Sequence, residues 1–396
     1  MTRRSPSLMP VFDRPDPYLD SAKILEDSRN LVLAGALLAE AERQFPGHEP
    51  VSHLRTEFIE RHHGPQAALA RWVLMSNRFP EDERIWAKLV RQHREAGRLQ
   101  SAEVVLAEGL AKAQQSKFLS AEGAVLAQAR GDLDEAARRW RAGIERYPRW
   151  PEAVLVHNVI QSARAVRELD MALEQGAQPP DTDHLFLASS EQGGEQARAL
   201  LSRFESLGED FRFGFVQRYY GAGAPGLFKY ARIAPANLVA ALDKDLAEII
   251  EARDAVLILQ PRDWFVRVPR AGLEILTLLE PVDPDGFLVR MRRRLRHLAM
   301  KLLEDLREGS KIFVLKAHNL GDDEISALHA AVRRHGAGSL LCVRRAAEGH
   351  APGSVEPRDN GLWVGHLPPG GLMDKFYRDV WIAICTAVAA AAPAGR

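Results

Sequence analysis

Hydrophobic positions between residues 28 and 150 recur with a period of 34 residues. In each unit a bulky apolar residue stands four positions after a small residue, about one helical turn away. The small residues are Ala34, Ala68, Ala102 and Ala136, and the bulky residues are Leu38, Trp72, Leu106 and Trp140. Three units close with an aromatic residue and a proline, which cannot continue a helix. The pattern predicts three to four antiparallel helix pairs.

This period, with its small, bulky and Phe/Tyr-Pro positions, resembles the tetratricopeptide repeat. The resemblance implies a short groove that binds a protein or peptide segment, because stacked units cannot bury both faces. The best preserved first helix lies in residues 81–97 and supplies the candidate binding residues Trp86, Leu89 and His93. A generic amphipathic helical bundle is the alternative, but such a bundle would not repeat its prolines at one spacing.

After residue 184 the 34-residue period disappears, and short apolar runs typical of strands take its place. The segment 322–335 has apolar residues at helical spacing and lies between two such runs, which predicts a parallel strand pair with a right-handed crossover. The predicted fold is therefore an α-helical repeat solenoid followed by an α/β domain with a partly parallel sheet. The predicted parts are an N-terminal arm (1–27), repeats with capping helices (28–176), a linker (177–184) and the α/β domain (185–396).

The segment 204–242 resembles the opening motif of a bacterial family of papain-like cysteine peptidases of unknown function. The matching residues are Leu207, Gly208, Glu209, Phe213, Gly214, Val216, Gln217, Arg218, Gly226, Leu227 and Pro235. Where the family pattern has its cysteine this chain has Phe211, and the segment 274–281, where family members commonly carry a histidine, contains none. Phenylalanine can be neither a thiolate nor a base, so the comparison favours a non-catalytic domain over an enzyme.

A polar cluster at the start of this motif is the candidate catalytic site if the domain is an enzyme. Glu209, Arg212, Gln217 and Arg218 would then provide acid/base chemistry and an anion site, with Arg218 also a candidate binding residue. A capped helix with a solvated polar face is the alternative interpretation. On the arginine-rich helix 290–301, Arg293 and Arg296 are candidates for a phosphate or nucleotide-sugar contact, against the alternative that they form a solvated face.

Charge and composition exclude several classes of function. The chain has 53 Lys+Arg and 53 Asp+Glu, so its formal net charge is zero, which argues against a nucleic-acid partner. Two cysteines, Cys342 and Cys385, cannot form a disulfide framework and are predicted to be buried. The histidines show no metal-binding spacing, so we predict no metal site and no cofactor. No apolar run predicts a signal peptide or a membrane span, and a cytoplasmic location is expected.

Two hypotheses of function remain. In the first, the chain is a protein–protein interaction adaptor or scaffold with a non-catalytic α/β domain, linked to bacterial surface polysaccharide or glycan pathways. In the alternative, it is a glycan- or polysaccharide-modifying transferase or hydrolase that uses the Glu/Arg/Gln cluster without a cysteine nucleophile. The link to glycans comes only from the domains that accompany the resembling family. Self-association through the repeats into a homo-oligomer is also left open.

Overall fold

The computed structural model describes residues 12–189, 192–260, 263–277, 283–317, 319–347, 349–370 and 374–392. The chain divides into two compact units, Met1–Arg139 and Trp140–Arg396. Within the described residues, no helix is long and apolar enough to cross a membrane.

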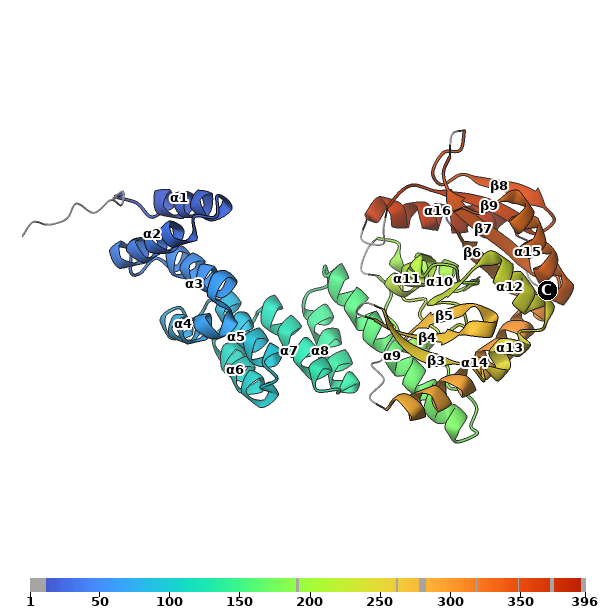
Figure 1. The fold of residues 1–396 in the computed structure, drawn as a ribbon, viewed down its shortest axis with the longest axis horizontal. Helices are drawn as coiled ribbons and strands as arrows, with labels where there is room; N and C mark the ends of the chain where they lie inside the picture. The colour runs from blue at the N-terminus through green and yellow to red at the C-terminus, as the bar shows by residue number, and fades with distance from the viewer. Residues whose placement is uncertain are drawn as a thin grey trace, which may run out of the picture. The chain divides into compact units, whose positions relative to one another are not determined.

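The first unit is built from antiparallel helix pairs, and Figure 1 shows their repeated hairpin arrangement. The first helix of each pair is followed by its partner after a turn of one to three residues. The pairs are α1 (Asp16–Asp27) with α2 (Leu31–Gln44), α3 (Glu49–His63) with α4 (Pro65–Arg78), α5 (Glu83–Glu95) with α6 (Leu99–Lys112), and α7 (Lys117–Ala129) with α8 (Leu133–Arg146). The predicted helix pairs are therefore confirmed, with α8 ending seven residues beyond the boundary of the unit.

The 34-residue ladder lies on the second helices. Ala34, Ala68 and Ala102 are fully buried, and Trp72 beside them is 0% exposed. Phe45 and Phe79 end α2 and α4, each donating its backbone N–H to the carbonyl four residues earlier, and a proline follows each of them. The small residues thus allow close helix approach, and the aromatic–proline pairs end the helices as the sequence predicts.

The predicted N-terminal arm contains a helix. Tyr18 and Ala22 of α1 are four residues apart and are buried in one cluster with Leu37 and Leu38 of α2. The ring of Phe12 packs edge-on against Tyr18, with 4.9 Å between the ring centroids. Because α1 pairs with α2, a helix pair begins at Asp16, within the residues predicted as the N-terminal arm.

A five-stranded sheet forms the centre of the second unit. Its order is β1-β6-β7-β9-β8, with β1, β6, β7 and β9 parallel and β8 antiparallel at one edge. The strands are β1 (Phe204–Ser206), β6 (Ile312–Lys316), β7 (Ser339–Arg345), β8 (Val355–Asp359) and β9 (Leu362–Leu367). Since β6 and β7 are parallel and joined through α15 (Asp322–His335), the predicted strand–helix–strand unit is confirmed.

A second, antiparallel sheet of four strands has the order β2-β5-β4-β3. Its strands are β2 (Ala231–Ile233), β3 (Val256–Gln260), β4 (Asp263–Val268) and β5 (Leu273–Leu276). The apolar runs at 255–260 and 264–268 are thus strands, but they belong to a separate sheet that the sequence pattern did not predict. The α/β fold class is confirmed, with mixed parallel and antiparallel sheets.

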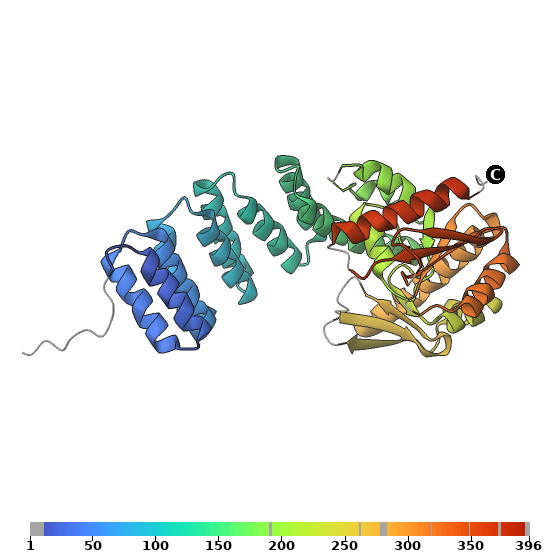
Figure 2. The same ribbon diagram turned by 90° about the horizontal axis from the view of Figure 1, so that it is seen from above.

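Helices cover both faces of the parallel sheet. In β6, Phe313 and Leu315 pack in the cluster that contains α15, whereas Ile312 and Val314 pack in the cluster that contains α16 (Lys375–Ala391). All five residues of β6 are buried, as expected for a central parallel strand. Figure 2 shows α16 along one side of this sheet. The remaining helices are α9 (Pro151–Glu174), α10 (Gly194–Leu201), α11 (Arg212–Tyr219), α12 (Pro235–Asp243), α13 (Ala247–Glu251) and α14 (Pro284–Glu308), with 3-10 turns η1 (Asp183–Leu185) and η2 (Pro269–Ala271).

The long helix α9 packs within the second unit, although the sequence pattern placed its residues with the capping helices of the repeats. Asn158 donates its side-chain amide to the carbonyls of Leu187 (2.8 Å) and Arg218 (3.0 Å) and accepts from the N–H of Leu187 (2.9 Å). Asp170 of α9 forms a buried ion pair with Arg294 of α14. These long-range polar contacts tie α9 to α11 and α14 and have no signature in local periodicity.

Candidate functional site

The turn after β1 lies at the carboxyl end of the parallel sheet. Leu207 continues the strand by donating its N–H to the carbonyl of Val314 (2.8 Å), and Gly208 and Glu209 both take positive φ angles, of 89° and 69°. A Cβ on Gly208 would lie 3.1 Å from the Ile233 side chain, so the position requires glycine on both grounds. A glutamate in the left-handed region is uncommon and costs of order 1 kcal/mol.

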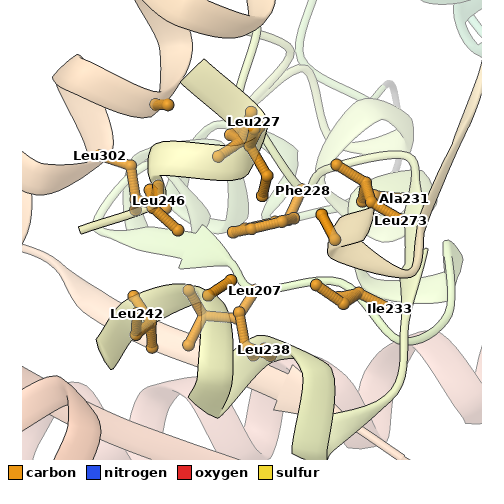
Figure 3. Packing of buried hydrophobic residues seen from close by; sticks show 14 of the residues in the cluster. Leu207, Leu227, Phe228, Ala231, Ile233, Leu238, Leu242, Leu246, Leu273 and Leu302 are labelled. Atoms are coloured by element: carbon orange, nitrogen blue, oxygen red, sulfur yellow. The ribbon is translucent and has the colours of Figure 1, made fainter. Parts of the chain in front are cut away.

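The core beneath this turn fixes its position. Leu207 is buried with Phe228, Ile233 and Leu238, and Figure 3 shows these side chains converging from the strand end, from β2 and from α12. Leu273 of β5 joins the same cluster. The antiparallel sheet therefore packs directly against the end of β1. Only Gly208 separates the strained Glu209 from the fully buried Leu207.

Glu209 lies in a polar hollow of about 520 Å³. The hollow is also lined by Arg232, Asn237, Arg267 and Glu274, of which Arg267 and Glu274 form an ion pair. Burial, together with the negative charge of Asp210, raises the pKa of Glu209 above its ordinary value. Its Oε2 atom is buried and has no hydrogen-bond partner among the described residues. A carboxyl group in this state can hold a proton or receive a hydrogen bond from a ligand.

The residues Arg232, Asn237, Arg267 and Glu274 of this hollow were not predicted. They come from β2, α12, β4 and β5, so up to 65 residues of chain separate them from Glu209. The antiparallel sheet that brings them together has no motif in the sequence, and no signal there could have grouped these residues.

The other members of the predicted polar cluster lie elsewhere. Arg212 starts α11, donates its N–H to Asp210 Oδ1 (2.9 Å) and reaches the carbonyl of Gly370 (3.4 Å). Gln217 is 4% exposed and donates its side-chain amide to the carbonyls of Phe204 (2.8 Å) and Leu201 (3.2 Å). Because its amide hydrogens are used to join α11 to β1, Gln217 has a structural role in the described contacts.

Arg218 is enclosed by aromatic rings. Its guanidinium lies 4.9 Å from the ring centroid of Phe215 and 5.1 Å from that of Tyr230, and the residue is 9% exposed. Cation–π contacts of this kind stabilise by about 1–2 kcal/mol when desolvated. The structure therefore does not bring the four predicted residues into one site, and only Glu209 lines the hollow.

Phe211, the residue that the sequence comparison aligns with a cysteine, belongs to an aromatic group. Its ring centroid is 6.0 Å from that of Phe215 and 6.1 Å from that of Phe265, and the Arg232 guanidinium lies 4.7 Å above it. The segment 274–281, where family members commonly carry a histidine, is described only as far as Thr277. Phe211 thus packs among aromatic rings, and Arg232 contacts both this ring and the hollow.

Both cysteines are buried, as predicted. Cys342 lies in β7 and Cys385 in α16, on opposite faces of the parallel sheet. Burial raises the pKa of Cys342 to about 12 and raises the pKa of Cys385 further. Neither thiol can form a thiolate near neutral pH, which is required of a nucleophile.

The predicted binding residues of the repeats differ in exposure. Trp86 (7% exposed) and Leu89 (2%) belong to the core cluster of α4, α5 and α6, and the Trp86 indole donates to the carbonyl of Pro80 (2.8 Å). His93 is half-buried at the end of α5 and accepts a hydrogen bond from Arg98 (3.2 Å). Burial and the charge of Arg98 lower the pKa of His93. Trp86 and Leu89 therefore stabilise the repeat and do not present a binding surface.

On α14, Arg293 is half-buried and Arg296 is exposed. The buried cation of this helix is Arg294, which shares its face with Met291, Leu295 and Leu298 and pairs with Asp170.

One group of described residues could hold a metal ion, namely His350, Glu356 and His366, whose ligand atoms lie within 4.8 Å of one another. The sequence analysis did not predict this group.

Comparisons with known proteins give weak likenesses. Neither a protein-family model nor a curated protein matches the sequence. Among solved structures, MamA (residues 41 to the end) from Desulfovibrio magneticus RS-1 is 11% identical, with a TM-score of 0.32 over 38% of this chain and 84% of that one. PilF of Pseudomonas aeruginosa is 16% identical, with a TM-score of 0.34 over 52% of this chain and 87% of that one.

A tetratricopeptide repeat protein from Parabacteroides merdae is 12% identical, with a TM-score of 0.34 over 72% of this chain and 98% of that one. At these scores the likenesses do not bear on function. The helix pairs and sheets themselves define the class: a tetratricopeptide-like helical repeat followed by an α/β unit with one mainly parallel and one antiparallel sheet.

Proposed function

We propose that this protein is a protein-interaction adaptor whose repeats bind an acidic segment of a partner protein. The observation that carries the proposal is a stripe of cationic residues along α5. Arg84, Lys88 and Arg91 stand at positions i, i+4 and i+7, so they share one face of the helix. A partner segment that follows this face would meet three positive charges in succession.

The charges of the stripe are more accessible than the carboxylates that pair with them. The Arg84 side chain is 58% exposed, whereas its partners Asp82 and Glu49 are 7% and 36% exposed. Lys88 is 28% exposed and pairs with Glu60, which is 18% exposed. Arg91 is 48% exposed and pairs with Glu122, which is also 7% exposed. The less exposed carboxylates thus orient the guanidinium groups, and the more exposed guanidinium groups present positive charge to an incoming segment.

An exposed aromatic residue occupies the corresponding position of the next repeat. Phe118 lies 34 residues after Arg84, at the start of α7, and is 50% exposed. The helices α5 and α7 are neighbours within the first unit. A partner segment that combines acidic residues with one large apolar residue would therefore match the chemistry of both helices.

Fluorescence anisotropy with a labelled 12-residue peptide, rich in glutamate and carrying one leucine, tests this proposal. We expect the full chain to bind the peptide, the affinity to fall with added salt, and the double variant Arg84→Glu/Arg91→Glu to bind at least about tenfold more weakly. Arg138→Glu is the matched control, because Arg138 is a 70% exposed arginine on α8 that also pairs with a glutamate. Equal loss in the control, or no effect of the double variant, would refute the proposal.

In this proposal the α/β unit is a non-catalytic relative of the papain-like peptidases, and the adaptor serves bacterial surface polysaccharide or glycan pathways in the cytoplasm. Phe211 at the position of the family cysteine and the buried thiols of Cys342 and Cys385 support a non-catalytic unit. Self-association of the repeats remains part of the proposal and is measured by light scattering at several protein concentrations.

The hollow at Glu209 favours a second candidate function, an enzyme that modifies glycans. Its support is the raised pKa of Glu209 in a polar hollow with Arg232 and Asn237, since a carboxyl that keeps its proton can act as a general acid. Arg212, Gln217 and Arg218 are not part of this version, because they do not line the hollow. Asn237 and Arg232 would orient the hydroxyl or anionic groups of the substrate.

Turnover assays with activated aryl glycosides and with a nucleotide-sugar separate the two functions. The enzyme hypothesis expects activity that is lost in Glu209→Gln and retained in Glu251→Gln, a change at an exposed glutamate of the same unit. Absence of turnover with every substrate, together with peptide binding by the repeats, favours the adaptor.

A further inference from the structure

Two strands of the parallel sheet's edge bring a glutamate and a histidine together. Val355 of β8 pairs with Gly365 of β9, and Glu356 pairs with Val364. Because side chains alternate along a strand, Glu356 projects from the same face as Val364 and therefore as His366, two residues further on. The turn Asn360-Gly361 joins the two strands, and a register shift between Pro357 and Asp359 moves the pairing by one residue, which brings Glu356 onto the face of His366.

A second histidine is placed over the first by the loop that precedes β8. Gly353 donates its N–H to the carbonyl of His366 (2.7 Å), and His366 donates its N–H to the carbonyl of Ser354 (3.1 Å). These bonds extend the ladder of the hairpin beyond β8. As a result the rings of His350 and His366 are parallel, with centroids 4.3 Å apart and 1° between their planes.

Three ligand atoms converge at this point. His350 Nδ1 lies 2.5 Å from Glu356 Oε1, and His366 Nε2 lies 2.9 Å from the same oxygen. Around a tetrahedral zinc ion, with bonds of about 2.0–2.1 Å, neighbouring ligand atoms are about 3.3 Å apart. The two distances to Glu356 Oε1 thus need to grow by less than about 1 Å to suit such an ion, and the two nitrogens already lie within 4.8 Å of each other. Because the rings are parallel, one of them must also turn so that both lone pairs meet at the ion.

The surroundings give the carboxylate of this group an outer-shell contact, whereas the buried Nδ1 of His366 has no hydrogen-bond partner among the described residues. Arg358 Nη2 lies 3.0 Å from the other oxygen of Glu356, Oε2, and so leaves Oε1 for the ion. The His366 side chain is fully buried, whereas His350 and Glu356 are 35% and 27% exposed. The group therefore has a rigid inner ligand and a side that solvent can reach.

We propose that His350, Glu356 and His366 bind a divalent transition-metal ion of the zinc type, with a fourth position open to water or to a ligand. Two imidazole nitrogens and one carboxylate oxygen match the ligand preference of Zn²⁺ and Co²⁺, whereas Mg²⁺ and Ca²⁺ prefer oxygen ligands alone. The site shares no residue with the repeats or with the hollow at Glu209. Its test therefore does not depend on either proposed function.

Titration of the full chain with metal ions, after treatment with a chelator, tests the site. We expect calorimetry to show one tight Zn²⁺ per chain, and Co²⁺ to give the visible d–d bands of a four- or five-coordinate complex. Two variants remove ligands in different ways. Glu356→Gln is isosteric, and His350→Ala removes a ring from a partly exposed loop position; each should weaken Zn²⁺ binding at least about tenfold.

His184→Ala is the control, because His184 is an exposed histidine of the same unit outside this group. Circular dichroism verifies that each variant is folded, and the isosteric Glu356→Gln keeps the test decisive if His350→Ala unfolds. Absence of saturable Zn²⁺ binding in the unmodified chain overturns the proposal and leaves a hydrogen-bonded cluster. Unchanged affinity in Glu356→Gln, or an equal loss in His184→Ala, overturns it as well.

Discussion

The ammonium group of Lys316 forms an ion pair with the carboxylate of Asp210 and thereby ties the end of β6 to the turn after β1. Lys316 is 4% exposed and Asp210 is 19% exposed, so the pair is largely withdrawn from water. A pair in this setting holds the turn that carries Glu209, because Asp210 also accepts the N–H of Arg212 at the start of α11.

Removing one partner of this pair should destabilise the second unit. We expect Lys316→Met to lower the free energy of unfolding by about 2 kcal/mol or more, because the Asp210 carboxylate loses its charged hydrogen bond. A double-mutant cycle with Asp210→Asn should give a coupling energy above about 1 kcal/mol by urea denaturation. The exposed pair Lys244–Glu248 is the control, with an expected coupling of about 0.3–0.5 kcal/mol. Equal coupling in both cycles would contradict this account.

The stability of the second unit should depend on the protonation of Glu209. Its pKa is raised in the folded chain, so the folded state keeps a proton that the unfolded chain releases near the ordinary value of 4.5. The contribution of Glu209 to stability is therefore fully present below that pH and is lost as the pH rises through the raised pKa. In Glu209→Gln this loss should disappear, whereas Glu251→Gln should retain it. Urea denaturation at a series of pH values measures the effect, and parallel curves for all three proteins would exclude it.

Leu89 should contribute to the stability of the repeats and should not contact a bound partner. It is 2% exposed in the core of the repeats, and replacing a buried leucine by alanine typically costs about 3 kcal/mol. We expect Leu89→Ala to lower the melting temperature markedly, and Val104→Ala, at a 51% exposed site on α6, to change it little. A normal melting temperature in Leu89→Ala would show that the core assignment is wrong.

Thiol reagents should leave the native chain unmodified. Cys342 and Cys385 are both 0% exposed, and burial raises their pKa values, to about 12 for Cys342. We expect Ellman's reagent to detect no thiol at neutral pH in the folded protein and two thiols in urea. Rapid reaction of one thiol without denaturant would mean that β7 or α16 opens locally.

Local periodicity was enough to predict the repeats. Ala68 and Trp72 recur in register with Ala102 and Leu106 because each helix pair packs on its neighbour in the same way. The same pattern predicted Trp86 as a binding residue. In the structure Trp86 is buried in the core together with Leu89 and Val90, which lie on the same apolar stripe of the helix. Periodicity identifies which face is apolar, but only packing decides whether a neighbour covers that face.

The sequence predicts only part of the arrangement in the hairpin of β8 and β9. The dipeptide Asn360-Gly361 favours a two-residue turn, but regular alternation from that turn would have paired Glu356 with Gly365 and placed it on the face opposite to His366. The register shift between Pro357 and Asp359, which the sequence does not predict, brings the two side chains onto one face. The sequence does not predict the place of His350 either, because backbone hydrogen bonds of a loop hold it and not strand register. Histidine spacing along a helix does not indicate a group that forms across strands.

The sequence by itself determined the two kinds of architecture in this protein. The spacing of apolar residues along the chain predicts both the 34-residue helical period and the buried strand–helix–strand unit. Tertiary structure alone decided three things: that α9 packs with the second unit through Asn158 and Asp170, that Glu209 shares a hollow with Arg232, and that two histidines meet at Glu356. Each of these depends on contacts between residues far apart along the chain, and the packing free energy that selects such contacts belongs to the whole fold.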